Sequence, residues 1–341
     1  MKQLISLIIL AALVLSCAEK KPVLHFYNWA DYVDPEMIAQ FEEEYDCRVI
    51  EDTFDSNESM YAKLKAGAVG YDVIVPSSYM VNIMIQQDML MPLDHNKISN
   101  LKNVDSSYVD IMLDPAMTYS VPWAVTFTGI AYLKDKVEIK EPSWRVFERS
   151  DLAGRMTLLN DMRETIGAAL KALGYSLNTT DERQLAQAKD LVLQWKKNIA
   201  KFENEQYKTG LVSEEFYLVH GYSGDILQVS QENENIVFML PKEGGSVSMD
   251  EMVIPKSAPN PDLAHKFINF MLRPEVAAAN IRFTSYLFPN KPAYELLPEE
   301  LRSDPILFPP AEIVSRFEVI RDLGIENQKY TRVWDEIKAG K

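Results

Sequence analysis

The chain has 341 residues, of which 47% are hydrophobic and 25% are charged. This composition is typical of a folded globular protein and excludes an intrinsically disordered chain or a multi-span membrane protein. The formal net charge of −15 disfavours nucleic acids and anionic lipids as partners and favours cationic ones. Because single hydrophobic cores stop growing near about 300 residues, the length predicts two lobes.

The N-terminal segment is predicted to be a lipoprotein signal peptide. Lys2 precedes an apolar run of twelve residues, which is too short to span a bilayer, and Ser16-Cys17 follows. Removal of residues 1–16 would leave lipid on Cys17 and a tether over residues 17–22. The alternative is an ordinary signal peptide with an incidental cysteine, because Val14-Leu15 departs from the commonest lipobox. We expect an extracytoplasmic protein anchored to a membrane through Cys17.

Besides the lipidated Cys17, the mature chain would have one cysteine, Cys47. Its net charge would be −16, because removing Lys2 takes one positive charge from −15. One cysteine cannot form an internal disulfide. Beside the apolar Val49-Ile50, Cys47 is expected to be a buried small side chain.

Strand and helix patterns alternate with short links at the start of the mature chain, which predicts the α/β class with mostly parallel sheets. Asp34-Pro35, for example, is a typical cap and first position of a helix. In chain order we expect strand 23–27, helix 36–45, strand 48–50, helix 57–66, strand 72–75, helix 181–199, strands 216–219, 236–240 and 252–254, and helices 262–272, 274–281, 312–323 and 330–339.

Three stretches carry candidate ligand-binding residues. Ligands bind beyond the carboxyl ends of strands in open α/β sheets, which selects the loops holding Trp29-Ala30-Asp31-Tyr32 and Ser77-Ser78-Tyr79. Aromatic residues at strand ends are, however, also common in cores and rims. Asp161 and Glu164 would share one face of a helical turn, but their spacing is also that of a helix-capping box. The spacing alone favours the cap.

Catalytic and cofactor motifs are incomplete. Gly221-Tyr222-Ser223-Gly224-Asp225 lacks the second glycine of a nucleophile elbow. Lys242-Glu243-Gly244-Gly245 lacks the spacing of a phosphate-binding loop, and the four histidines show no metal-ligand spacing. We therefore expect a binding protein without catalytic residues, cofactor or metal. An anchored hydrolase using Asp161 and Glu164 as an acid–base pair is the alternative, although neighbours on one helix would contact the same side of a substrate.

Six motifs spread over nearly all of the mature chain support a family resemblance. They are FYNWADY (26–32), SNESMYAKL (56–64), YDVIVPSSY (71–79), LGYSLNTT (173–180), PKEGG (241–245) and FINFMLRP (267–274). In this order they resemble the spermidine/putrescine-binding proteins of bacterial ABC importers.

The resemblance implies a two-lobed periplasmic-binding-protein-like fold of type II, with a ligand cleft between the lobes. Lobe 1 would comprise residues 23–126 and 251–298, and lobe 2 residues 127–250 and 299–341. It further implies a monomer that captures a polyamine, putrescine or spermidine, by hinge closure and delivers it to an ABC permease. A related receptor for another small cationic solute is the alternative, because the fold alone does not determine the ligand.

Carried over residue by residue, the resemblance implies a site in which carboxylates bind ammonium groups and aromatic rings cover the methylene stem. Its residues are Trp29, Asp31, Tyr32, Ser77, Tyr79, Asp161, Glu164, Tyr222, Asp250 and Tyr286.

Several positions depart from the spermidine-binding pattern. Ser248 and Tyr222 stand where tryptophans are seen, Ile320 where a glutamine is seen, and Ala30 where a threonine is seen. Asp31 matches the putrescine binders, whereas the spermidine binders have glutamate. These departures predict a preference for putrescine over spermidine, with both bound.

Overall fold

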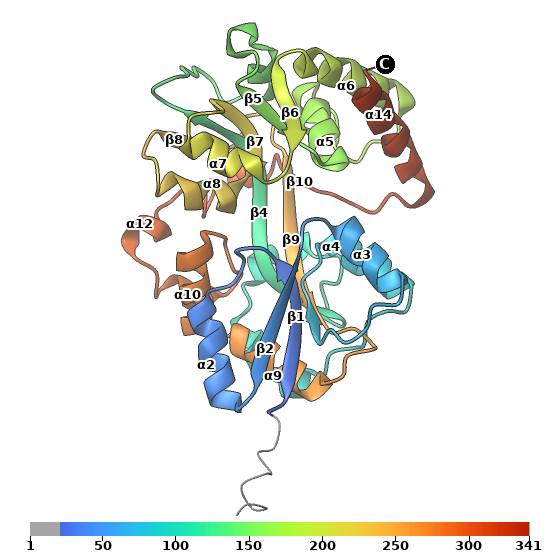
Figure 1. The fold of residues 1–341 in the computed structure, drawn as a ribbon, viewed down its shortest axis with the longest axis vertical. Coiled ribbons are helices and arrows are strands. Elements are labelled where there is room, and N and C mark those ends of the chain that lie inside the picture. The colour runs from blue at the N-terminus through green and yellow to red at the C-terminus, as the bar shows by residue number, and fades with distance from the viewer. Residues whose placement is uncertain (1–20, 341) are drawn as a thin grey trace, which may run out of the picture.

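The structure is a computed structural model that describes residues 21–340. The predicted signal peptide, the lipidation site Cys17 and most of the tether lie outside the described residues. Figure 1 shows two bodies stacked along the long axis and joined by two long strands, β4 (Ser120–Leu133) and β9 (Ser246–Val253). We call the body around the N-terminal strands lobe 1 and the other body lobe 2.

Lobe 1 begins with the predicted alternation of strands and helices. β1 pairs in parallel with β2 and β3, and Asp34 caps α2 by accepting a hydrogen bond from the Glu36 backbone N–H at 2.9 Å. The predicted helices near residue 270 are also present. The elements are β1 (Val23–Trp29), α2 (Pro35–Tyr45), β2 (Arg48–Phe54), α3 (Asn57–Lys65), β3 (Val73–Ile74), α4 (Ser78–Gln86), α9 (Pro261–Met271), α10 (Pro274–Thr284) and α11 (Lys291–Tyr294).

Lobe 2 has a second sheet in which β5 pairs in parallel with β6 and β7. Helices α5, α6 and α14 pack together over it (Figure 1). Its elements are β5 (Met156–Leu159), α5 (Met162–Ala172), α6 (Glu182–Lys196), β6 (Ile199–Glu203), α7 (Gln206–Val212), β7 (Leu218–Tyr222), α8 (Ser223–Ser230), β8 (Ile236–Met239) and α14 (Asn327–Ala339). The segment before α14 contains α12 (Glu299–Arg302), α13 (Ala311–Val314) and β10 (Glu318–Val319).

The long strands join the two sheets into one. The strand order is β2-β1-β3-β9-β4-β7-β5-β6, and β9 runs antiparallel to both β3 and β4. In this ladder Ala124 pairs with Asp250 and Thr126 with Ser248. The chain was predicted to pass from one lobe to the other at residues 126/127 and 250/251, and both positions fall inside the linking strands β4 and β9. The exact limits of the lobes stay a prediction.

Aromatic packing fills both lobes. In lobe 1 the Phe267 ring lies 4.9 Å from that of Phe26 and 5.0 Å from that of Phe41. Lobe 2 has a separate cluster containing Trp144 and Trp195. Cys47 is buried, as predicted.

The predicted helix 312–323 is wrong. α13 ends at Val314, and β10 then pairs in parallel with β9. Lys171 of α5 holds Glu318 in this strand through an ion pair of 2.8 Å. The backbone at this point therefore uses its hydrogen bonds in the sheet instead of a helix.

Candidate ligand-binding site

Asp250 lies on β9, the strand that links the lobes, and its side chain is buried. Tyr32 donates a hydrogen bond of 2.6 Å to Oδ2, and the Ser77 hydroxyl donates one of 2.6 Å to Oδ1. Asn57 holds Ser77 in turn with its side-chain amide, 3.1 Å from the hydroxyl oxygen. Burial raises the pKa of Asp250 to about 6, while the two hydrogen bonds lower it. This carboxyl is therefore placed firmly and ionises near neutral pH.

A second carboxylate, Asp225, lies in the first turn of α8. Tyr207 and Tyr286 both donate hydrogen bonds to it, the latter at 2.8 Å. The ring of Tyr286 meets that of Tyr32 edge to face, with centroids 4.7 Å apart. Two tyrosines thus connect Asp250 to Asp225. The sequence reasoning missed Asp225, because its motif was compared only with a hydrolase elbow.

Asp161 and Glu164 occupy the start of α5. Asp161 caps this helix by accepting hydrogen bonds from the backbone N–H groups of Arg163 at 2.8 Å and Glu164 at 3.0 Å. The capping interpretation is therefore confirmed. Glu164 is buried and accepts a hydrogen bond of 2.6 Å from the Ser246 hydroxyl. Burial, with repulsion from Asp161, raises the pKa of Glu164 to about 8.

Residues of lobe 1 face this helix start. Tyr79 donates a hydrogen bond of 2.9 Å to Glu58, a carboxylate that the sequence reasoning quoted in a motif but did not select. Glu58 is an exposed residue. The protein packed around its carboxyl still raises its pKa, and the charge of Asp161 raises that pKa further. Tyr222 of lobe 2 also feels the charges of Asp161 and Glu164. Carboxylates of both lobes are therefore in electrostatic contact here.

The loop after β1 supplies the remaining predicted residues. Trp29 donates its indole N–H to the Val75 carbonyl at 2.9 Å and packs on Phe54, so it has a structural role whether or not it binds a ligand. Asp31 is exposed and has a φ of 56°, a left-handed conformation that aspartate tolerates better than most residues. Burial raises the pKa of the neighbouring Glu51, and the charge of Asp31 raises it further.

The predicted site residues thus form two connected groups. Tyr32, Ser77, Asp250 and Tyr286 are joined by hydrogen bonds or ring contact, and Tyr286 also donates to Asp225. The group at α5 is connected to them along β9, because Ser246, which donates to Glu164, precedes Asp250 on this strand by four residues. Two tyrosines therefore lie between the carboxylates of Asp250 and Asp225. Within residues 21–340 no cluster of histidine, cysteine, aspartate or glutamate is arranged to hold a metal ion. Over the same range no helix has the length and apolar character needed to cross a bilayer.

Comparisons with known proteins agree with this architecture. A family model described as bacterial extracellular solute-binding protein matches residues 36–309. The putrescine/cadaverine-binding protein of Pseudomonas aeruginosa is 34% identical, with 98% of each chain covered. A putative spermidine/putrescine ABC transporter structure from Listeria monocytogenes has a TM-score of 0.88 at 36% identity, covering 94% of this chain and 100% of that one. The TpPotD lipoprotein of Treponema pallidum has a TM-score of 0.84 at 35% identity, covering 92% and 99%.

The fold and the shared length define an extracytoplasmic solute-binding protein, a non-enzymatic class. Within that class, the chain belongs to the spermidine/putrescine-binding protein family of bacterial ABC transporters. The predicted α/β binding-protein fold and the expectation of a binding protein instead of a hydrolase are both confirmed.

Proposed function

We propose that this protein captures a polyamine between its lobes and delivers it to an ABC permease. The observation that carries the proposal is the pair of contacting tyrosines, Tyr32 and Tyr286, that lies between two carboxylates, Asp250 and Asp225. A polyamine is a chain of methylenes with ammonium groups, so it needs this alternation of charge and aromatic surface. The names of the relatives support the same ligand class.

The energies suit tight binding. A hydrogen bond to an ionised group contributes about 1.5 to 3 kcal/mol, and each buried methylene contributes about 0.8 kcal/mol. Cation–π contacts add about 0.5 to 2 kcal/mol each. Two paired ammonium groups and four methylenes therefore suffice for submicromolar affinity, about 8 kcal/mol, after the cost of ordering the ligand.

We further propose that putrescine is preferred over spermidine. Ser248 and Ile320 remove a wall and a polar group expected for the longer triamine, and Asp31 matches the pattern of the putrescine binders. The relative that binds putrescine and cadaverine supports a diamine site. The site residues remain the ten that the sequence predicted, with Asp225 and Glu58 added from their contacts.

Titration calorimetry with putrescine, cadaverine, spermidine and spermine tests both proposals. We expect submicromolar binding of putrescine and weaker binding of spermidine. Arginine and choline serve as cationic solutes outside the class. Heat from one of these and none from the polyamines would replace the proposal by the alternative of another cationic solute.

We also propose that the mature protein is anchored through lipid on Cys17. The apolar segment before Ser16-Cys17 supports this, and a lipoprotein is among the similar structures. Mass spectrometry of the N-terminal peptide from a membrane fraction tests the anchor. A mature chain that begins at another residue, with Cys17 unmodified or removed, would contradict it.

A further inference from the structure

Lys208 is a cation placed among the carboxylates of the candidate site. It lies in α7, next to Tyr207, whose hydroxyl donates to Asp225. Its ammonium is 3.0 Å from Glu205, but the Glu205 side chain is 60% exposed and that of Lys208 only 17%. Exposed ion pairs of this kind contribute little to stability. The pairing alone therefore does not explain why a lysine is withdrawn from solvent here.

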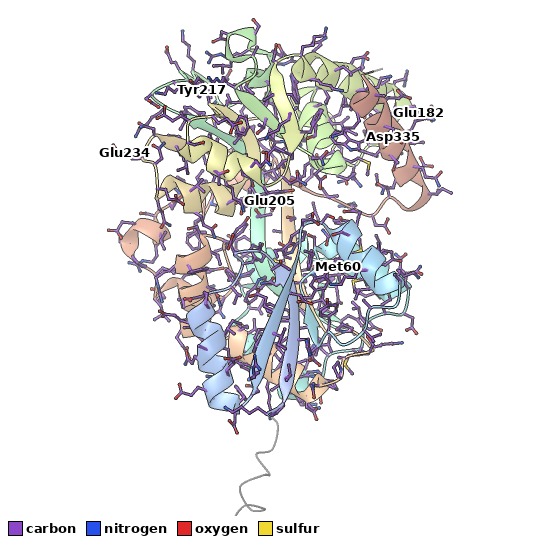
Figure 2. The ribbon with its side chains drawn as sticks, viewed as in Figure 1. Met60, Glu182, Glu205, Tyr217, Glu234 and Asp335 are labelled. Carbon is purple, nitrogen blue, oxygen red and sulfur yellow. The ribbon has the colours of Figure 1, made fainter. Side chains whose placement is uncertain are left out.

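The charged groups around Lys208 follow from the position of α7 in lobe 2. Figure 2 shows Glu205, at the start of this helix, on the side of lobe 2 that faces lobe 1. The neighbouring helix α8 reaches lobe 1 through Gln228, whose side-chain amide donates to the Thr284 carbonyl at 2.8 Å and to the Asp31 carbonyl at 3.5 Å. The loop that carries Asp31 is thus held against the helices that carry Asp225 and Lys208.

Charges of both lobes act on Lys208. Burial lowers its pKa, but the carboxylates of Asp225, Glu205 and Asp31 outweigh burial and leave the pKa above its ordinary value. Lys208 therefore keeps its positive charge at neutral pH. It stands in the field of two carboxylates, Asp31 of lobe 1 and Asp225 of lobe 2, that would otherwise attract a ligand ammonium.

We propose that Lys208 is a specificity-determining residue, a built-in cation that partly neutralises the Asp31 and Asp225 end of the site and disfavours ligands with additional ammonium groups. This proposal rests on the proposed polyamine-binding function and deepens it. Each ammonium brought near this end is repelled by Lys208, so a triamine loses more affinity than a diamine. Lys208 thereby gives a physical reason for a diamine preference besides the loss of the tryptophan at Ser248.

Calorimetric titrations of Lys208→Gln, Lys208→Arg and Lys197→Gln with putrescine and spermidine test the proposal. Lys197 is an exposed lysine at the end of α6, so it is a control for the overall change of charge. We expect Lys208→Gln to bind spermidine about tenfold more tightly, the effect of one unit charge at short range, and putrescine less so. Lys208→Arg keeps the charge and should match the wild type, and Lys197→Gln should also match it. The gain should shrink in high salt.

The outcomes separate the two proposals. Weaker binding by Lys208→Gln would show that the lysine holds the lobes together, and unchanged binding would show that its charge does not reach the ligand; both would overturn the Lys208 role alone. A wild-type protein that binds no polyamine would instead overturn the proposed function, and this inference with it. Melting temperatures of the variants show whether each is folded, and Lys208→Met, which also removes the charge, gives the same test if Lys208→Gln does not fold.

Discussion

Polyamine binding should release protons, because the pKa values of two buried site carboxyls, Glu164 and Asp250, are raised to the neighbourhood of neutral pH. The pKa of Glu164 is about 8 and that of Asp250 about 6, each raised chiefly by burial. At pH 7 the first is about 90% protonated and the second about 10%. A ligand ammonium favours the ionised form of both, so binding at pH 7 should release about one proton. The ammonium groups themselves resemble a lysine side chain and keep their charge in this range.

The pH dependence of affinity follows from the same release. Near pH 7 the association constant should rise about tenfold per pH unit, and it should level off above about pH 8, where Glu164 is already ionised. At pH 6 the release should be larger, about 1.5 protons, because Asp250 is then half protonated. The affinity should rise with pH and not fall, because a cationic ligand binds the ionised form of the carboxyls.

Calorimetry with putrescine in phosphate and in Tris at pH 7 measures the released protons directly, because these buffers differ in their heat of ionisation. Glu164→Gln should lose most of the release. Glu251→Gln is the matched control: Glu251 is equally buried but accepts its hydrogen bonds from Ser78 and Ser120. Equal heats in both buffers, with affinity constant from pH 6 to 8, would refute the reasoning.

Three further predictions concern single substitutions. Asp250→Ala should weaken polyamine binding by about 3 to 5 kcal/mol, because an ammonium loses its buried partner. Ser77→Ala should weaken binding by only about 1 kcal/mol. If calorimetry gave the two variants equal affinities, Asp250 would not contact the ligand. Gly224→Ala would place a Cβ 2.2 Å from the ring of Tyr286. The substitution should therefore destabilise the fold by about 1 to 3 kcal/mol and weaken ligand binding. An unchanged melting temperature would contradict this prediction. The pKa of Glu251 is raised by burial to about 7, so its contribution to folding should be lost as the pH rises from about 4.3, where the unfolded glutamate ionises, to about 7. Denaturant unfolding at pH 5 and 8 should show a larger loss of stability in the wild type than in Glu251→Gln, in which Glu164 and Asp250 still titrate; equal losses in the two proteins would count against this.

Local signals predicted much of the fold. Asp34-Pro35 started a helix where expected, and most of the helix expected over 181–199 is present as α6. The long strand β4 was missed, because its residues are buried almost throughout and show no alternation of polar and apolar side chains. The helix expected at 312–323 failed for a tertiary reason, since β10 takes its partner from a strand about 70 residues earlier in the chain.

Local sequence signals predicted less of the candidate site than of the fold. The spacing of Asp161 and Glu164 correctly indicated a helix cap, but not that Glu164 would be buried against Ser246. Nothing near Asp225 in the sequence reveals its two tyrosine partners, because Tyr207 precedes it by 18 residues and Tyr286 follows it by 61. Contacts between the lobes depend on the topology of the sheet, which pattern reading does not resolve.

A crystal structure with bound putrescine would locate the two ammonium nitrogens and so test polyamine binding between the lobes. We expect one nitrogen within about 3 Å of an Asp250 carboxylate oxygen, the ordinary length of such a hydrogen bond. The methylenes should lie against the tyrosine rings, and the other nitrogen should lie among the carboxylates of lobe 2. Putrescine bound away from Asp250, or in contact with one lobe only, would contradict this expectation.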